Sequence, residues 1–256
     1  MTTAALANSA CRYQRSLDLF LLALAFVAVW QFFFAIGGTT ALASPWQATA
    51  HALSLLTSHS FWVNARATLL AFGIAVAFEI VFGIAIGIAL GLNKWSGDVL
   101  EPMFAGFYSL PKLMFYPIVT LFCGIGLLSA VIFGILHGVV SIILFTMSAV
   151  RNIKPVYVKT GRVMNLSTAQ MMWTIALPGA LPEIFTGLRI GISASLIGVI
   201  LYELFGSSKG VGFLLMNAME NNITVDISAY TLILIVFAIL VSGTLMVIDE
   251  RLHKRL

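Results

Sequence analysis

Five ionisable side chains lie within long apolar stretches of the sequence, namely Glu79, Lys112, His137, Arg189 and Glu203. A charged group in hydrocarbon is costly, so such residues often contact a transported solute, an ion or a proton. Arg189 lies close enough to a stretch end to extend to the lipid headgroups, and Glu203 lies close enough to pair with Lys209. Glu79 and His137 lie nearer mid-stretch, where a hydrogen bond to a neighbouring helix explains them as well as contact with a solute does.

The segment SLPKLMFYP places two prolines, Pro111 and Pro117, on either side of Lys112. Each proline lacks a backbone donor and clashes with the preceding helical turn, which predicts a kink or a break. Interrupted backbone at membrane depth occurs where it is buried in protein or lines a wet cavity. The alternative is a proline kink used only for packing. The candidate pathway-lining residues are therefore Glu79, Pro111, Lys112, Pro117 and His137.

The sequence does not indicate a catalytic or metal site. No nucleophile with a matching base is recognisable, and no metal-ligand cluster stands out. His51 and His59 have no cysteine or carboxylate nearby at ligand spacing, so a solvated polar face explains them better. The phosphate-binding pattern GxxxxGK(S/T) is absent, and the nearest glycine–lysine pair is GSSKG. We therefore expect neither an enzyme nor a cofactor or metal ion.

The composition indicates an integral membrane protein. Of the 256 residues, 60% are hydrophobic and 9% are charged, and the mean hydropathy is +1.02, too apolar for a soluble domain. A membrane-spanning helix needs about 20 mostly apolar residues. Six stretches of this kind predict an all-α polytopic fold with about six transmembrane helices: 17–36, 67–92, 99–122, 127–150, 184–205 and 227–248. One membrane domain, residues 17–250, is expected between the tails 1–16 and 251–256.

The basic residues indicate the orientation of these stretches. If the N-terminus is cytoplasmic, ten lysines and arginines fall on the cytoplasmic side and Lys209 alone falls outside, as the positive-inside rule predicts. Both termini are then cytoplasmic. The net charge of +4 is explained by this distribution, so nucleic-acid binding has no support. The ten residues are Arg12, Arg15, Lys94, Arg151, Lys154, Lys159, Arg162, Arg251, Lys254 and Arg255.

Small residues recur at a spacing of four in three of the stretches. This spacing puts them on one helix face, where backbones can approach closely in lipid. Contact with a second subunit is possible for each stripe, but packing within one subunit is the commoner use. The stripes are Gly83, Gly87 and Gly91; Gly134 and Gly138; and Gly187, Gly191 and Ser195.

The connection 151–183, assigned to the cytoplasm, is too long for a plain loop, and its signals are helical. Pro155 suits the first position of a helix. Asn165 is predicted to end that helix in the left-handed conformation, which asparagine tolerates better than most residues. Four side chains of this helix share one face by their spacing: Val156, Thr160, Val163 and Met164.

A second short helix is predicted directly after the first. Ser167 and Gln170 form an S-x-x-Q capping box, in which each side chain accepts a backbone hydrogen bond from the other residue. Pro178 is expected to stop this helix, and Pro182 with Glu183 to begin the fifth membrane stretch. The helix pair displays apolar side chains that need a covering surface: Tyr157, Met164, Met171, Met172 and Trp173.

This helix pair resembles the signature loop in permease subunits of bacterial ATP-binding-cassette (ABC) importers, which reads EAA, a glycine four residues on, then LP. Leu177 and Pro178 match the LP, and Asn165 occupies the glycine position. The EAA positions hold Lys159, Thr160 and Gly161. An ammonium thus replaces the usual carboxylate, which changes the charge that a partner's groove must accept.

The resemblance extends beyond the motif, from about Ser44 to the C-terminus. The segments SLPKLMFYPIVTLFCGIG, 109–126, and ALPGALPEIFTGLRIGISASLIGVILYELFGSSKGVG, 176–212, are similar to the sulfonate, taurine, nitrate and thiamine-pyrimidine branch of the family. The resemblance implies a permease subunit in a bacterial inner (plasma) membrane that forms the solute pathway and couples it to a separate ATPase. The solute implied is a small anion or heterocycle of sulfonate, taurine, nitrate or thiamine-precursor type.

The resemblance also implies partners and a coupling role for the helix pair. The partners are cytoplasmic ABC ATPase subunits, an external or periplasmic substrate-binding protein, a second permease subunit, identical or paralogous, and membrane lipid. The connection 151–183 becomes the coupling loop that docks onto the ATPase. Its implied contact residues are Tyr157, Lys159, Thr160, Gly161, Met164, Asn165, Met172, Trp173, Leu177 and Pro178.

A secondary transporter driven by an ion gradient is the alternative function, with Glu79 and His137 as proton sites. A membrane enzyme is the third and weakest possibility. Uptake that survives ATP depletion but collapses with an uncoupler favours the secondary transporter. Co-purification with a Walker-type ATPase favours the importer.

Overall fold

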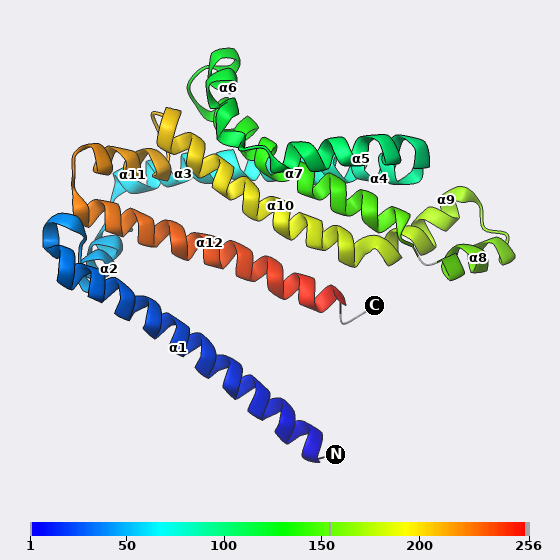
Figure 1. The fold of residues 1–256 in the computed structure, drawn as a ribbon, viewed down its shortest axis with the longest axis horizontal. Helices are drawn as coiled ribbons and strands as arrows, with labels where there is room; N and C mark the ends of the chain where they lie inside the picture. Colours follow the sequence, from blue (N-terminus) through cyan, green and yellow to red (C-terminus); the bar gives the residue numbers. More distant parts are fainter. Residues whose placement is uncertain (1, 154, 254–256) are drawn as a thin grey trace. The chain divides into compact units, whose positions relative to one another are not determined.

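The computed structural model describes the backbone of residues 2–153 and 155–253. Side chains are described for residues 17–251, except 19, 20, 94, 154, 155, 158, 162, 168, 169, 172 and 176. Seven of the basic residues used for the orientation, and Met172, therefore lie outside the described side chains. Every regular element in the described backbone is a helix, which confirms the expected all-α class (Figure 1).

The helices follow one another through short connections. In order they are α1 Thr2–Ala41, α2 Pro45–Leu55, α3 His59–Phe78, the π-helix η1 Glu79–Gly83, α4 Ile84–Leu92, α5 Lys94–Ser109, the 3₁₀-helix η2 Lys112–Phe115, α6 Tyr116–Cys123, α7 Leu127–Arg151, α8 Pro155–Val163, α9 Thr168–Met171, the π-helix η3 Met172–Ala176, α10 Leu177–Gly206, α11 Val211–Glu220 and α12 Thr224–His253.

Five helical segments among the described residues are long and apolar enough to cross a membrane: Leu21–Ala41, His59–Leu92, Leu127–Arg151, Leu177–Gly206 and Thr224–Arg251. They account for five of the six expected stretches. The remaining stretch, 99–122, is not one continuous helix but is divided among α5, η2 and α6. The fold is therefore polytopic as predicted, with one interrupted segment in place of a sixth long helix.

The interruption lies at the prolines, as predicted. Helix α5 ends at Ser109, and the backbone is extended at Leu110 (φ −69°, ψ 139°) and at Pro111 (φ −68°, ψ 99°). The extended Leu110 follows from its position, because the ring of a following proline disfavours helical backbone. Pro117 lies in the first turn of α6, where its missing N–H costs no hydrogen bond.

The interrupted segment runs from one end of α7 to the other (Figure 1). Near its start, a Cβ atom built on Gly97 would lie 3.1 Å from Nη1 of Arg151, at the last residue of α7. Near its finish, the hydroxyl of Tyr116 donates to the carbonyl of Phe205 (2.8 Å), and Gly124 accepts from Tyr202 (3.3 Å). Helices α5, η2 and α6 together therefore cover the same span as α7.

Helix α7 is the centre of the core, packed between α10 on one side and the α3–η1–α4 segment on the other. Glycines allow this close packing, because Cβ atoms in their place would lie under 3 Å from α7. The contacts are Gly83 with Ile142, Gly87 with Thr146, Gly91 with Val150, Gly187 with Phe145, and Gly191 with Ile142 and the carbonyl of Gly138. These stripes thus pack within one subunit, the commoner of the two uses considered for them.

The chain divides into two compact units. One unit comprises residues 1–58 and 217–233, and the other comprises residues 59–216 and 234–256. The second unit contains α7 and the helices around it. It also contains both sets of candidate functional residues.

The first unit is held by polar contacts around α2. Ser44 caps α2 through a capping box with Gln47. His51 Nε2 lies 2.6 Å from Oδ1 of Asp226 at the start of α12. His51 is partly exposed, as expected for a polar helix face, and the fold also brings to it a carboxylate 175 residues away in the sequence.

Candidate functional site

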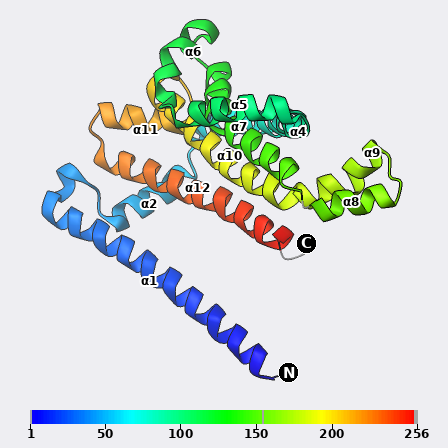
Figure 2. The ribbon, with the colours of Figure 1, turned by 45° about the vertical axis from the view of Figure 1, so that its right-hand side comes forward.

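Two short helices, α8 and α9, project beyond the adjoining ends of α7 and α10 (Figures 1 and 2). The first begins at Pro155, as predicted, and ends at Val163. Asn165 follows with φ 53°, in the left-handed region expected for it. The N–H of Leu166 donates to the carbonyl of Gly161 (3.0 Å), the bond that closes a Schellman motif.

The second helix begins with the predicted capping box. The N–H of Ser167 donates to Oε1 of Gln170 (2.9 Å), and the N–H of Gln170 donates to Oγ of Ser167 (3.3 Å). Two backbone donors at the helix start are thereby satisfied. The capping residues thus fix where α9 leaves the turn.

The expected stop at Pro178 is wrong. The helix passes through η3 directly into α10, which begins at Leu177 and includes both Pro178 and Pro182. The wider turn of a π-helix separates a proline ring from the carbonyl of the preceding turn, so the clash that ends an α-helix is relieved. The hydroxyl of Thr174 also donates to the carbonyl of Gln170 within this region.

Gly161 is the residue at which the two short helices touch. A Cβ atom there would lie 2.4 Å from Sδ of Met171 and 2.9 Å from Cδ1 of Ile175. A hydrogen at this position lets α8 rest on α9 and η3. The small residue at the third signature position therefore has a packing reason in this chain.

The outer surface of the helix pair is apolar. Five large side chains are exposed by 45% to 84%: Val156, Tyr157, Val163, Met164 and Trp173. We call these five residues the apolar patch. Among the other predicted contact residues, Lys159, Thr160 and Asn165 are exposed and Leu177 and Pro178 are half-buried. Val156 and Val163 share the predicted apolar helix face, a signal that pointed to them before the fold was known.

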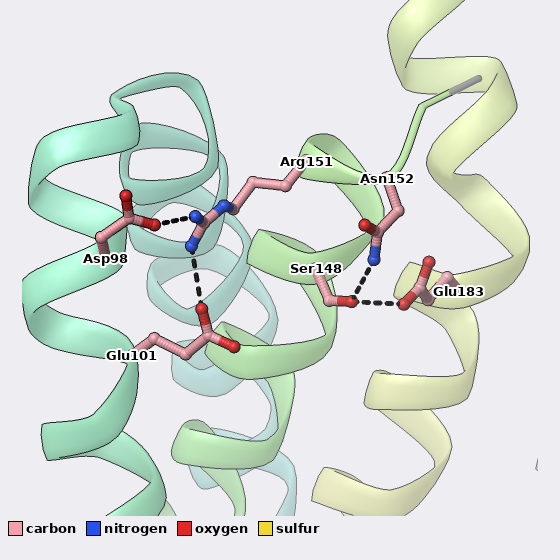
Figure 3. Close-up of polar contacts among 6 residues, drawn as sticks. All are labelled: Asp98, Glu101, Ser148, Arg151, Asn152 and Glu183. Atoms are coloured by element: carbon pink, nitrogen blue, oxygen red, sulfur yellow. Dashed lines mark hydrogen bonds and ion pairs between the residues drawn. The ribbon is translucent and has the colours of Figure 1, made fainter. Parts of the chain in front are cut away.

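Two separate sets of polar contacts lie at the end of α7, from which the chain leads into the helix pair (Figure 3). The guanidinium of Arg151, the last residue of α7, forms ion pairs with Asp98 and Glu101 of α5, the second at 2.8 Å. The hydroxyl of Ser148 on α7 donates to Oε1 of Glu183 on α10 (2.7 Å). No local sequence pattern indicates these contacts, because the bonded residues lie up to 53 residues apart.

The candidate pathway residues do not form one cluster. Glu79 begins η1 and is fully buried, with its carboxylate against Gly138 of α7, and neither carboxylate oxygen has a hydrogen-bond partner among the described residues. His137 is half-buried, and its Nδ1 donates to the carbonyl of Phe133 (2.8 Å). The hydrogen bond of His137 is therefore local to α7, whereas Glu79 is a buried polar side chain that the described residues leave without a hydrogen bond.

Lys112 is the first residue of η2, directly after the break. Its ammonium donates to the carbonyl of Tyr108 (3.0 Å) and lies 4.9 Å from the centre of the Tyr108 ring. Pro111 and Pro117 flank this site as expected. A lysine side chain has three donors, so Lys112 retains donors for a further acceptor.

The two charges near stretch ends have partners that sequence analysis did not predict. Glu203 accepts from the hydroxyl of Thr68 (2.8 Å) and the N–H of Gly212 (3.0 Å), in place of the expected pairing with Lys209. Arg189 Nε lies 3.3 Å from Oδ2 of Asp249 on α12. Both side chains therefore connect α10 to other helices of the second unit: Glu203 to α3 and α11, and Arg189 to α12.

Comparison with known proteins identifies close relatives. Residues 79–256 match the family described as the binding-protein-dependent transport system inner membrane component. The taurine transport system permease protein TauC of Escherichia coli K12 is 28% identical over 193 residues, covering 75% of this chain and 70% of TauC. The bicarbonate transport system permease protein CmpB of Synechococcus elongatus is 30% identical over 241 residues, covering 84% of this chain and 83% of CmpB.

A solved structure has the same fold. A chain from inward-facing conformations of the MetNI methionine ABC transporter superposes with a TM-score of 0.62 at 18% sequence identity. The match covers 73% of this chain and 93% of that one. At this identity the likeness concerns the fold alone.

Proposed function

Because the chain belongs to the family of binding-protein-dependent transport system inner membrane components, and is thus the permease subunit of an ABC importer, we propose that α8 and α9 form the element that docks onto the ATPase. Subunits of this family work with a separate ATPase and a substrate-binding protein, and they are not enzymes. The family assignment does not favour a secondary transporter.

The apolar patch is the observation that carries this proposal. Several large apolar side chains exposed on one short helix pair favour a surface that another molecule covers. Lipid does not suit this place, because the patch lies beside the exposed polar Lys159, Thr160 and Asn165, past the apolar length of α7. An ATPase groove that accepts one ammonium and five apolar groups fits this surface.

The test introduces charge into the patch. In the variant Met164→Asp/Trp173→Asp, docking would bury two unpaired carboxylates, at a cost of several kcal/mol each. The variant should reach the membrane and fold, yet lose the ATPase from a pull-down and lose uptake. The matched control is Met219→Asp/Trp46→Asp, which changes the same residue types at exposed sites outside the helix pair. Normal ATPase retention by the patch variant would contradict the proposal.

We also propose that the helix pair and both termini face the cytoplasm of the cell that carries this inner-membrane protein. Five continuous spans alone would leave the termini on opposite sides. The interrupted segment α5–η2–α6 supplies the sixth crossing, because it covers the same span as α7. Residues 17–250 then act as one permease domain between two cytoplasmic tails.

The proposed solute is a small anion or heterocycle. Relatives are named for transport of taurine, bicarbonate, nitrate, aliphatic sulfonates and formylaminopyrimidine. The spare donors of Lys112 at the break support an anionic group. Measuring which of these compounds binds to the substrate-binding protein encoded nearby, and whether its uptake needs this chain, tests the assignment.

The proposed assembly contains a second permease subunit, identical or paralogous, in contact with membrane lipid. Lys112 is only half-buried on one chain, so a pathway that includes it needs a second surface opposite. Co-purification of two differently tagged copies distinguishes a homodimer from a pair of different chains.

A further inference from the structure

Two separate sets of polar contacts at the end of α7 connect this helix to α5 and to α10. Arg151 lies at the end of α7, and its guanidinium binds two carboxylates, Asp98 and Glu101, spaced by three residues on α5. The arginine side chain is 22% exposed, whereas the carboxylates are about half exposed. The arginine is thus the more buried partner, and its two ion pairs hold the first turns of α5 against the end of α7 (Figure 3).

Gly97 makes room for this contact. A Cβ atom at residue 97 would lie 2.8 Å from the carbonyl of Leu90, at the end of α4, and 3.1 Å from Nη1 of Arg151. The guanidinium therefore lies against the backbone of α5, close to where α4 ends.

A second set of bonds fixes the other flank of the helix pair. Ser148 of α7 donates to Glu183 of α10, and the side-chain amide of Asn152 donates to the Ser148 hydroxyl (3.0 Å). The chain thus leaves α7 at Asn152, and after the helix pair Glu183 of α10 is hydrogen-bonded to the same end of α7. A movement of the helix pair must then displace the end of α7, and Arg151 with it.

Helix α5 leads from this joint to the break at Leu110 and Pro111, directly before Lys112. We propose that Arg151, with Asp98 and Glu101, is a positioning joint that passes movement of the docked helix pair to α5 and so to the interrupted segment. The proposal rests on the docking function above. It assigns to three residues outside α8 and α9 a role in coupling rather than in docking.

The test reads movement at the far end of α5 without knowledge of the solute. In a background of Cys11→Ser and Cys123→Ser, the variant Ser109→Cys places a thiol at the last residue of α5, which is exposed. The purified complex with its ATPase is labelled with a maleimide, either without nucleotide or trapped with ATP, magnesium and vanadate. The nucleotide should change the labelling rate about fivefold or more, the lower end of typical allosteric couplings.

Arg151→Gln should abolish most of this change while the ATPase stays bound and hydrolyses ATP. The matched control is Arg66→Gln, which removes an exposed arginine from α3 and should leave the nucleotide response intact. Asp98→Asn/Glu101→Gln removes the same ion pairs by changing the two half-exposed carboxylates. This variant tests the proposal even if Arg151→Gln fails to fold. A restored response in Arg151→Glu/Glu101→Arg would show that the ion pair itself transmits the movement.

The outcomes separate this proposal from the docking function. An unchanged nucleotide response in both joint variants, with the ATPase bound, overturns the joint and leaves docking intact. Loss of the ATPase from folded joint variants also overturns it, because these residues would then belong to the docking surface. The docking function itself fails only if the patch variant Met164→Asp/Trp173→Asp retains the ATPase.

Discussion

Gly138 is the residue at which three helical segments come closest. A Cβ atom there would lie 2.4 Å from Oε2 of Glu79 and 2.5 Å from the carbonyl of Gly191. Because one of these neighbours is backbone, Gly138→Ala should force α7 and α10 apart. Overpacking of this kind costs about 1–3 kcal/mol, so the detergent-solubilised protein should lose thermal stability. In the control Gly73→Ala, no atom lies within 4 Å of the added Cβ, so its thermal stability should be unchanged. Equal melting temperatures for the two variants would contradict the packing argument.

At the scale of an element, Asn165 sets the angle between α8 and α9. A left-handed conformation costs a residue with a side chain roughly 1–2 kcal/mol, and β-branched residues tolerate it least. Asn165→Gly should therefore retain the ATPase in a pull-down, and Asn165→Val should not. Asn222 has φ 55° near the end of α11, so Asn222→Val is a control with matched backbone strain. If Asn165→Val transports like its parent at equal expression, the helix pair does not need this turn.

At the scale of the whole molecule, the orientation of the chain can be measured by thiol labelling. In the same background without native cysteines, Lys159→Cys should be protected from an impermeant maleimide in intact cells, and Lys209→Cys should react. The reason is that the two residues lie at opposite ends of α10. Permeabilised cells provide the control, because both sites should then react. Labelling at residue 159 alone in intact cells would refute the orientation and, with it, the docking function.

Local signals determined much of this protein from sequence. Apolar length indicated the membrane helices, because a span must bury its backbone polar groups within one segment. Pro111 and Pro117 predicted the break, and Asn165, Ser167 and Gln170 predicted the turn between the short helices. Each of these signals acts within a few residues of the backbone that it controls, which is why no knowledge of the fold was needed. Helical spacing also indicated three residues of the apolar patch: Val156, Val163 and Met164.

Only the tertiary structure decided which distant groups meet. Glu203 binds Thr68 and Gly212 in place of Lys209, and Arg151 binds two carboxylates about 50 residues earlier in the chain. Such pairs depend on how α3, α5 and α10 pack around α7, and no local pattern encodes that packing. Pro178 shows the same limit within one element, because the π-turn before it lets α10 begin where an α-helix alone would stop. The sequence therefore determined the elements, and the packing of the helices determined the joints between them.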